Sequence, residues 1–144
     1  MFATMHNPAA AYSKVGVETG VSSADPHQLI IMLFDGALLS VSSASLAMQR
    51  GDIAAKGQAV SRAIDIVTNG LKASLDFDVG GELAQRLGAL YDYMCARLVH
   101  ANLKNEKPAL EEVSRLLSEL KGAWEQIGKK PAAGEAGKPL AAAA

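Results

Sequence analysis

Four breaks divide an otherwise helix-forming sequence, and they constrain the fold more than any other feature. The breaks are Asp25-Pro26, Gly51-Asp52, Gly80-Gly81 and Pro108. The stretches between them have similar lengths and consist of strong helix formers, without the alternation of a β-strand. Short links place consecutive helices antiparallel. The sequence therefore predicts an all-α protein, an antiparallel up-down-up-down four-helix bundle.

Capping residues mark where the helices begin and end. Asp25 can accept hydrogen bonds from free backbone N–H groups, Pro26 suits the first helical position, and Gln28 completes a pattern like a capping box. Residues 50–52 combine a glycine suited to a left-handed residue with an aspartate suited to capping. The same letters, RGD, form an integrin-binding tripeptide, but that needs an extended extracellular loop. We interpret them as helix punctuation.

The three later helices should each bury one apolar side. We expect them at about Asp52 to Leu75, Gly81 to Leu103 and Pro108 to Ile127. The last has the most regular pattern, because its apolar residues step alternately by three and four. These are Leu110, Val113, Leu117, Leu120, Trp124 and Ile127.

The ends of the chain should lie outside the bundle. Residues 129–144 are mostly Ala, Pro, Gly and Lys, which predicts a disordered tail. Residues 1–22 predict a mobile N-terminal arm with a short helix near 8–14 and one aromatic anchor, Tyr12. The expected bundle covers residues 23–128.

The first helix carries more apolar surface than a bundle needs. At about 100° per residue, only the sector with Asp35, Ser42 and Gln49 is clearly polar. The helix could simply be the most central one. Alternatively, part of it forms a groove for another chain's helix. Burying a side chain such as Ile30 or Phe34 contributes roughly 1.5 to 3 kcal/mol, so a few could support binding.

Composition argues against several classes of protein. The 14 basic and 15 acidic residues nearly balance, which disfavours nucleic acid and anionic membranes as partners. The longest strongly apolar run, Leu29 to Phe34, is too short to span a bilayer, and no secretion signal is evident. Cys95 is the only cysteine, so neither an intrachain disulfide nor a cysteine zinc site can form. We expect a cytoplasmic protein without membrane insertion.

No catalytic or metal-binding constellation is present. His6, His27 and His100 are far apart in sequence, and no pair has helical spacing with carboxylates. We expect no cofactor, no metal and no enzymatic activity. The residues after His100 faintly resemble a histidine phosphotransfer motif, but its Leu-Lys pair falls one position late, on another helical face. Phosphotransfer through His100 is the enzyme-class alternative.

Two motifs that could suggest nucleotide binding fit a helical protein better. Gly80-Gly81 lacks the preceding strand and the following Lys-Ser/Thr of a phosphate loop, so it is interpreted as a reversal between helices. Tyr91 and Tyr93 could stack on bases, but no basic stripe lies beside them. A position in the core or at a groove edge is favoured.

Five segments, taken in order and spacing, are similar to those of a known family. They are SADPHQLIIMLFDGA (Ser23 to Ala37), RGDIAAKGQAVSRAIDIVTNGLKASLD (Arg50 to Asp76), GGELAQRLGALYDYM (Gly80 to Met94), LVHANLKNE (Leu98 to Glu106) and LKGAW (Leu120 to Trp124). Together they resemble the flagellin export chaperones of the FliS family. No single motif is decisive, but the ordered set, from about Tyr12 to Ile127, is highly specific.

The resemblance implies a cytoplasmic bundle that binds the disordered C-terminal segment of flagellin. Binding there would prevent premature filament polymerisation and keep the subunit competent for flagellar type III secretion. In this family, flagellin contributes short helices to apolar grooves, and the N-terminal arm can cover part of that surface. The family's N-terminal Tyr matches Tyr12. Phe34 stands where the family often has Tyr, which removes a hydroxyl group.

The expected binding surface follows from the apolar surplus and the resemblance together. The predicted flagellin contacts on the first helix are Ile30, Ile31, Phe34, Leu38 and Val41. Tyr12 is expected over part of that surface in the free protein, and the later helices are expected to add Ile66, Tyr91 and Tyr93. A generic helical adaptor or a homodimeric bundle using the same apolar face is the binding-class alternative. The sequence leaves open whether the export gate or an anti-sigma factor shares the surface.

Overall fold

The computed structural model describes residues 25–129. The predicted N-terminal arm, with the short helix near 8–14 and the anchor Tyr12, lies outside the described residues. The predicted tail lies outside them from residue 130 onward.

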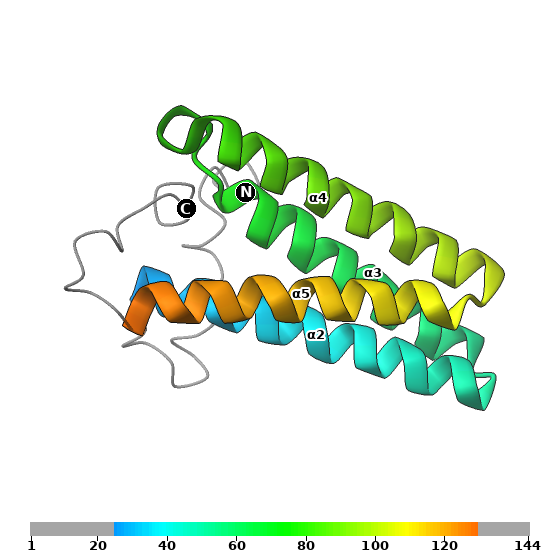
Figure 1. Ribbon diagram of the computed structural model, residues 1–144. Helices are drawn as coiled ribbons and strands as arrows, with labels where there is room; N and C mark the ends of the chain where they lie inside the picture. The colour runs from blue at the N-terminus through cyan, green and yellow to red at the C-terminus, as the bar shows by residue number, and fades with distance from the viewer. Residues whose placement is uncertain (1–24, 130–144) are drawn as a thin grey trace, which may run out of the picture.

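The described residues form helices and contain no strand, so the all-α prediction is confirmed. The elements are α2 (Pro26–Arg50), α3 (Ile53–Asp65), the π-helical η2 (Ile66–Leu71), the 3-10 turn η3 (Lys72–Ser74), α4 (Phe77–Lys104) and α5 (Lys107–Lys129). In Figure 1 consecutive long helices run in opposite directions along the bundle. The second predicted helix is thus α3 continued by η2 and η3.

Capping occurs as predicted at the first two breaks. The Asp25 carboxylate accepts a hydrogen bond of 2.7 Å from the backbone N–H of Gln28, and Pro26 occupies the first turn of α2. Gly51 ends α2 in the left-handed region at φ 71°. The Asp52 carboxylate then accepts from the N–H of Ala55 at 3.0 Å, which starts α3.

The third break contains two separate signals. The Asp76 carboxylate accepts from the N–H groups of Asp78 and Val79 at 3.0 Å each and begins α4. Gly81, at φ 53° and ψ −128°, is not helical and divides this first turn from the long helix that follows. The predicted break at Gly80-Gly81 is therefore present, and a turn capped by Asp76 precedes it.

The four long helices pack in a ring in chain order. α2 contacts α3, η2 and α5, while α4 contacts α3, η2 and α5. The core includes several side chains that are fully buried, among them Met94, Leu98, Leu110, Val113 and Leu117. On α2 the buried positions are mostly small, which lets the neighbouring helices approach closely. Sequence analysis gave two explanations for the apolar surface of the first helix. This packing agrees with the first of them, a central position in the bundle.

By length and composition alone, α2 could cross a membrane. The sequence analysis judged the run from Leu29 to Phe34 too short to span a bilayer. The whole helix meets the length because small and weakly polar residues extend the apolar stretch beyond that run. The inner side of α2 forms part of the bundle core, and Asp35 on another side forms an ion pair with Lys121 of α5 at 2.6 Å. Packing within the bundle accounts for this apolar character.

Candidate functional site: an apolar groove between α4 and α5

Three of the predicted contact residues belong to the core. Phe34 is 3% exposed, Val41 2% and Tyr91 5%. Burial also raises the pKa of the Tyr91 hydroxyl well above its ordinary value. Phe34 and Val41 lie two turns apart on the side of α2 that faces its own bundle. A partner could touch these side chains only if the bundle opened.

Two others lie on the side of α2 that α5 covers. Ile31 and Leu38 are half-buried and flank Asp35 by one helical turn on either side. The Asp35 carboxylate lies 2.6 Å from the ammonium group of Lys121 on α5. α5 therefore occupies much of the space in which the sequence placed a partner's helix.

The remaining predicted residues retain accessible surface. Ile30 and Ile66 are half-buried and pack against the core. Ile66 sits close to Gly36 of α2, where an added Cβ atom would lie 3.3 Å from its Cδ1 atom. Tyr93 is 44% exposed. The structure thus distributes the described members of the predicted set over α2, η2 and α4 and does not assemble them into one groove.

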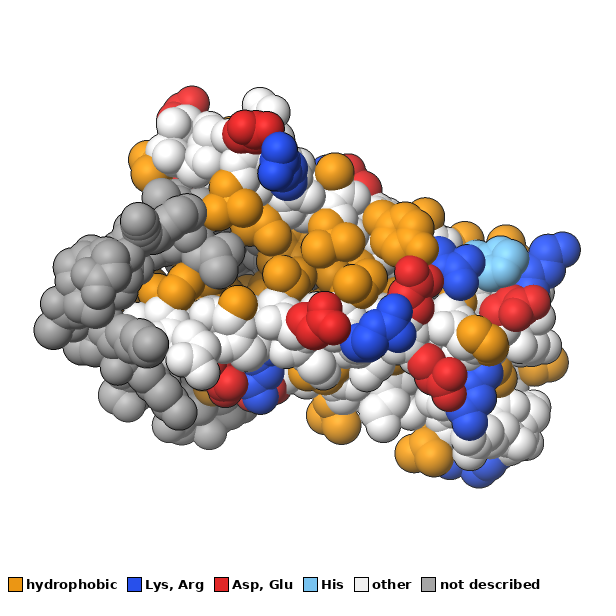
Figure 2. Space-filling view, viewed as in Figure 1, with side chains coloured by type: hydrophobic (Ala, Val, Ile, Leu, Met, Phe, Trp, Pro, Cys, Tyr) orange, Lys and Arg blue, Asp and Glu red, His pale blue; other side chains and the backbone are white. Residues whose placement is uncertain are grey.

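A hollow with an apolar lining lies elsewhere, between α4 and α5. Figure 1 shows α4 separating from α5 toward its N-terminal end, and Figure 2 shows apolar side chains filling the space between them. The large side chains that face this space are all half-buried. They are Leu83, Leu87 and Leu90 on α4, and Leu116, Leu120 and Ile127 on α5. We call this surface the α4/α5 groove.

Helical register supports this assignment. On α4, Leu90 lies two turns before Arg97, which reaches α5. On α5, Leu116 and Leu120 follow Glu112 by one and two turns, and Glu112 reaches α4. The leucines therefore project from the same sides of the two helices as the bonds that join them.

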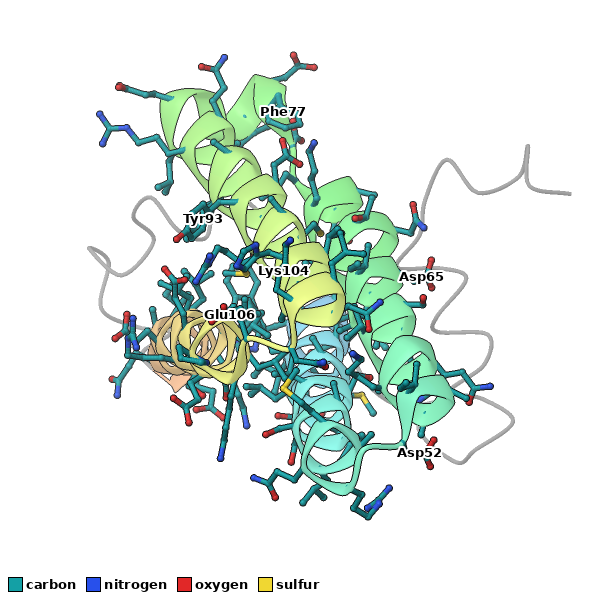
Figure 3. All side chains as sticks on the ribbon, turned by 90° about the vertical axis from the view of Figure 1, so that its right-hand side faces the viewer. Asp52, Asp65, Phe77, Tyr93, Lys104 and Glu106 are labelled. Carbon is teal, nitrogen blue, oxygen red and sulfur yellow. The ribbon has the colours of Figure 1, made fainter. Side chains whose placement is uncertain are left out.

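A hydrogen-bonded bridge closes one end of the groove. The Tyr93 hydroxyl donates to Glu112 Oε2 at 2.6 Å, and Arg97 Nε donates to Glu112 Oε1 at 2.7 Å. Figure 3 shows Tyr93 on the side of α4 that faces α5. The hydrogen bonds from Tyr93 and Arg97 lower the pKa of the Glu112 carboxyl, while the same carboxylate raises the pKa of the Tyr93 hydroxyl. The bridge follows Leu90 on α4 and precedes Leu116 on α5, so it marks one end of the groove.

A second polar contact joins the C-terminal part of α5 to the N-terminal part of α2. The His27 and Trp124 rings stack with centroids 5.1 Å apart. His27 Nε2 lies 2.7 Å from the Trp124 carbonyl oxygen, to which it must donate because a carbonyl only accepts. Trp124 Nε1 donates to the His27 carbonyl oxygen at 3.1 Å. α5 is thereby held on α2 while its other side stays free beside α4.

The side chains that line the groove are apolar. Within residues 25–129, no group of three or more His, Cys, Asp or Glu side chains could hold a metal ion. Burial is the main influence on the Cys95 thiol and raises its pKa, which disfavours the reactive thiolate. His100 is exposed on the outside of α4. Partly covered leucines can instead take up an apolar segment of another chain.

Sequence reasoning missed most of this groove. Leu120 and Ile127 were recognised as part of a regular apolar seam, but the seam was assigned to packing between helices of the same chain. Periodicity shows which side of a helix is apolar, not whether its neighbour lies close enough to cover it. The sequence shows the apolar positions of the third and fourth helices, but only the structure shows which of them stay half-buried.

The sequence matches known proteins over most of its length. Residues 8–131 match the family described as Flagellar protein FliS. The flagellar secretion chaperone FliS of Salmonella typhimurium is 55% identical over 120 residues, which cover 83% of this chain and 89% of that protein. The Escherichia coli K12 chaperone is 47% identical, covering 81% and 85% of the two chains, and that of Bacillus subtilis 168 is 34% identical, covering 85% and 86%. The chain therefore belongs to the FliS family of flagellar secretion chaperones.

Proposed function

We propose that this chain is a cytoplasmic, non-enzymatic chaperone that binds the disordered C-terminal segment of flagellin. Bound there, it would prevent premature polymerisation and keep the subunit competent for flagellar type III secretion. The observation that carries the proposal is the α4/α5 groove, an apolar surface that the chain's own described helices leave half covered. Membership of a flagellar chaperone family supports a flagellar protein as its occupant.

The groove suits a partner that arrives without fixed structure. The six groove side chains are already largely covered, so covering the remainder would contribute roughly 0.5 kcal/mol each, well below the value for a side chain buried from full exposure. Ordering a disordered segment costs about 2 to 5 kcal/mol. The two quantities are comparable, so the net gain must come from the partner's own apolar side chains, which a helix with apolar residues three and four apart would bury between α4 and α5.

The originally predicted contacts take different roles in this proposal. Ile30, Ile66 and Tyr93 keep enough exposure to touch flagellin directly. The other described members support the groove from within the bundle: Ile31, Phe34, Leu38, Val41 and Tyr91. Tyr12 would cover part of the groove in the free protein and leave when flagellin binds. The export gate and an anti-sigma factor are further candidate partners, and each can be tested by competition with a flagellin peptide.

Calorimetric titration of the full chain with a flagellin C-terminal peptide tests the proposal. Leu87→Asp and Leu120→Asp each place a carboxylate in the groove, and we expect each to weaken binding at least about tenfold. Leu103→Asp is the matched control, because Leu103 also lies on α4 but is 72% exposed. Circular dichroism establishes that each variant is folded. Folded groove variants that bind with wild-type affinity would contradict the proposal.

A further inference from the structure

A pocket lies at the end of the bundle where α2 turns into α3 and α4 turns into α5. Figure 3 looks onto this end, with Asp52 at one turn and Lys104 and Glu106 at the other. The pocket has a volume of about 480 Å³, within the range of small-molecule sites. The residues that line it are Ala47, Met48, Gly51, Asp52, Ile53, Lys56, Asn105 and Lys107. None of them belongs to the α4/α5 groove.

The lining includes a buried lysine. Lys56 on α3 is only 5% exposed, and its Nζ atom donates to the Asn102 carbonyl oxygen at 2.9 Å and to Asn105 Oδ1 at 2.5 Å. Both acceptors are neutral. Within residues 25–129 no carboxylate forms an ion pair with Lys56, although buried charges are normally paired. An ammonium group carries three N–H donors, so one donor of Lys56 is left for a further acceptor.

Holding the end of α4 explains part of this arrangement. The Asn102 carbonyl belongs to the last turn of the helix, where carbonyl groups lack intrahelical partners and a cation is favoured. Asn105 ends α4 in the left-handed region at φ 54°. Neither role requires an open pocket beside the ammonium group of Lys56, and neither uses its third N–H.

Two more donors border the pocket, and its charge is slightly positive. The Asn105 side-chain oxygen accepts from Lys56, which leaves the NH₂ group of the same amide as a donor. Lys107 begins α5, is exposed and forms no ion pair within the described part of the chain. Asp52 supplies the carboxylate of the lining, and it already accepts from the backbone N–H of Ala55 at 3.0 Å. Two lysines against one aspartate leave one net positive charge.

The walls of the pocket are apolar. Ala47 is buried, Met48 is half-buried and Ile53 is 75% exposed. From these walls, the buried ammonium group and the single excess positive charge, we infer that the pocket binds an aliphatic carboxylate. The carboxylate group accepts from Lys56, and the hydrocarbon body packs against Met48 and Ile53. A small free acid and the last residue of a polypeptide, where that residue is apolar, share this chemistry.

The inferred site is separate from the proposed flagellin site. Leu90 in the groove and Asn105 at the pocket are 15 residues apart along α4 and its C-cap, which corresponds to about 22 Å along a helix axis. Binding in the pocket and binding in the groove can therefore be measured independently.

NMR titration of the isotope-labelled full chain tests the site with three probes: N-acetyl-leucine, its uncharged amide and inorganic phosphate. We expect the acid to shift the backbone amides of residues 47–56 and 105–107 saturably, and to bind at least about tenfold more tightly than the amide. Phosphate lacks a hydrocarbon body and should bind more weakly than the acid. Equal affinity for the acid and the amide, or tighter binding of phosphate, would overturn the inference.

A short peptide that ends in leucine with a free carboxylate distinguishes the two sources of the ligand. Binding at least about tenfold more tightly than N-acetyl-leucine would assign the site to a polypeptide end, and equal binding would assign it to a small acid. The same peptide with an amidated end should bind at least about tenfold more weakly in either case. An amidated peptide that binds as tightly as the free one would contradict the inference.

Variants identify the group that holds the carboxylate. Lys56→Met keeps the aliphatic stem but removes the ammonium group, so the acid should lose its advantage over the amide. Because Lys56 also holds the end of α4, circular dichroism must show that this variant is folded. Lys107→Gln changes an exposed position and should weaken binding of the acid about threefold.

Lys104→Gln is the matched control, because it removes the same charge from an exposed residue outside the lining. Its affinity for the acid should equal that of the wild type. A folded Lys56→Met that still prefers the acid, or equal effects of Lys107→Gln and Lys104→Gln, would overturn the inference. All three variants should bind the flagellin peptide like the wild type, so failure of this site and failure of the chaperone proposal are distinguishable.

Discussion

α5 makes two lateral contacts in this bundle, and they differ in how completely they are closed. Against α2, the Asp35–Lys121 ion pair and the His27–Trp124 stack fasten the two helices. Against α4, the Glu112 bridge joins the helices at one level, and beyond it they separate. α5 is therefore closely packed on the side that faces α2 and partly uncovered on the side that faces α4.

Because of this difference, some apolar residues of α5 stabilise the fold while others remain available for binding. Leu110, Val113 and Leu117 of α5 are at most 1% exposed and form the core. Leu120 stays half-buried although it belongs to the same periodic pattern, and Leu116 beside the pattern is half-buried as well. Side chains that the bundle itself does not cover are available to a partner, and their burial then contributes to binding instead of folding.

The largest expected effect compares neighbouring leucines of α5. Leu117→Ala removes a fully buried side chain and should lower the free energy of unfolding by about 2 to 5 kcal/mol. Leu120 lies beside the α4/α5 groove, where water already reaches part of its side chain. Leu120→Ala should therefore lower the free energy of unfolding by only about 1 kcal/mol. Urea denaturation followed by circular dichroism measures both. Equal losses would mean that the seam with α4 is closed as well.

Glycines of α5 give a second comparison. A Cβ atom added at Gly128 would clash with Cε1 of His27, so Gly128→Ala must displace the ring that fastens α5 to α2. We expect it to lower the free energy of unfolding by about 1 to 3 kcal/mol. Gly122→Ala is the control: its Cβ would meet nothing within 4 Å, and it should stabilise the helix by roughly 0.5 to 1 kcal/mol. Thermal denaturation of the two variants should shift in opposite directions.

Helix boundaries were largely predictable from the sequence, because capping depends on residues close to each helix end. Asp25, Gly51 and Asp52 act where predicted because a cap depends on residues within one turn. A break is present at Gly81 as predicted, but the short turn that Asp76 caps four positions before Gly80 was not anticipated. The interruption of α3 by the π-helical η2 could not be anticipated, since no proline marks it.

The candidate site was much less predictable than the fold. The apolar surplus of the first helix is present, but it divides between an inner side with Phe34 and Val41 and an outer side with Leu39 and Leu46. Which apolar residues stay uncovered depends on the distance between α4 and α5, and that distance is set by the packing of the whole bundle. A pattern within one helix carries no information about it.

The smallest expected effect concerns the bridge that ends the open seam. Hydrogen bonds from Tyr93 and Arg97 lower the folded-state pKa of Glu112 below its ordinary value. The bridge therefore stabilises the fold above the unfolded-state pKa of this carboxyl, and that contribution is lost as the pH falls through the lowered folded-state pKa. Glu112→Gln removes the titrating group, so its urea midpoint should decline less between neutral and acidic pH than that of the wild type.

Glu119→Gln provides the matched control for this pH dependence, because Glu119 lies exposed on the same helix and forms no such bridge within residues 25–129. The profile of this variant in the acid range should follow the wild type. Tyr93→Phe deletes the hydrogen bond that contributes most to the lowered pKa and should fall between Glu112→Gln and the wild type. If Glu112→Gln and Tyr93→Phe also kept the wild-type profile, the bridge would contribute nothing to the junction of α4 and α5. The groove would then owe its closed end to apolar packing alone.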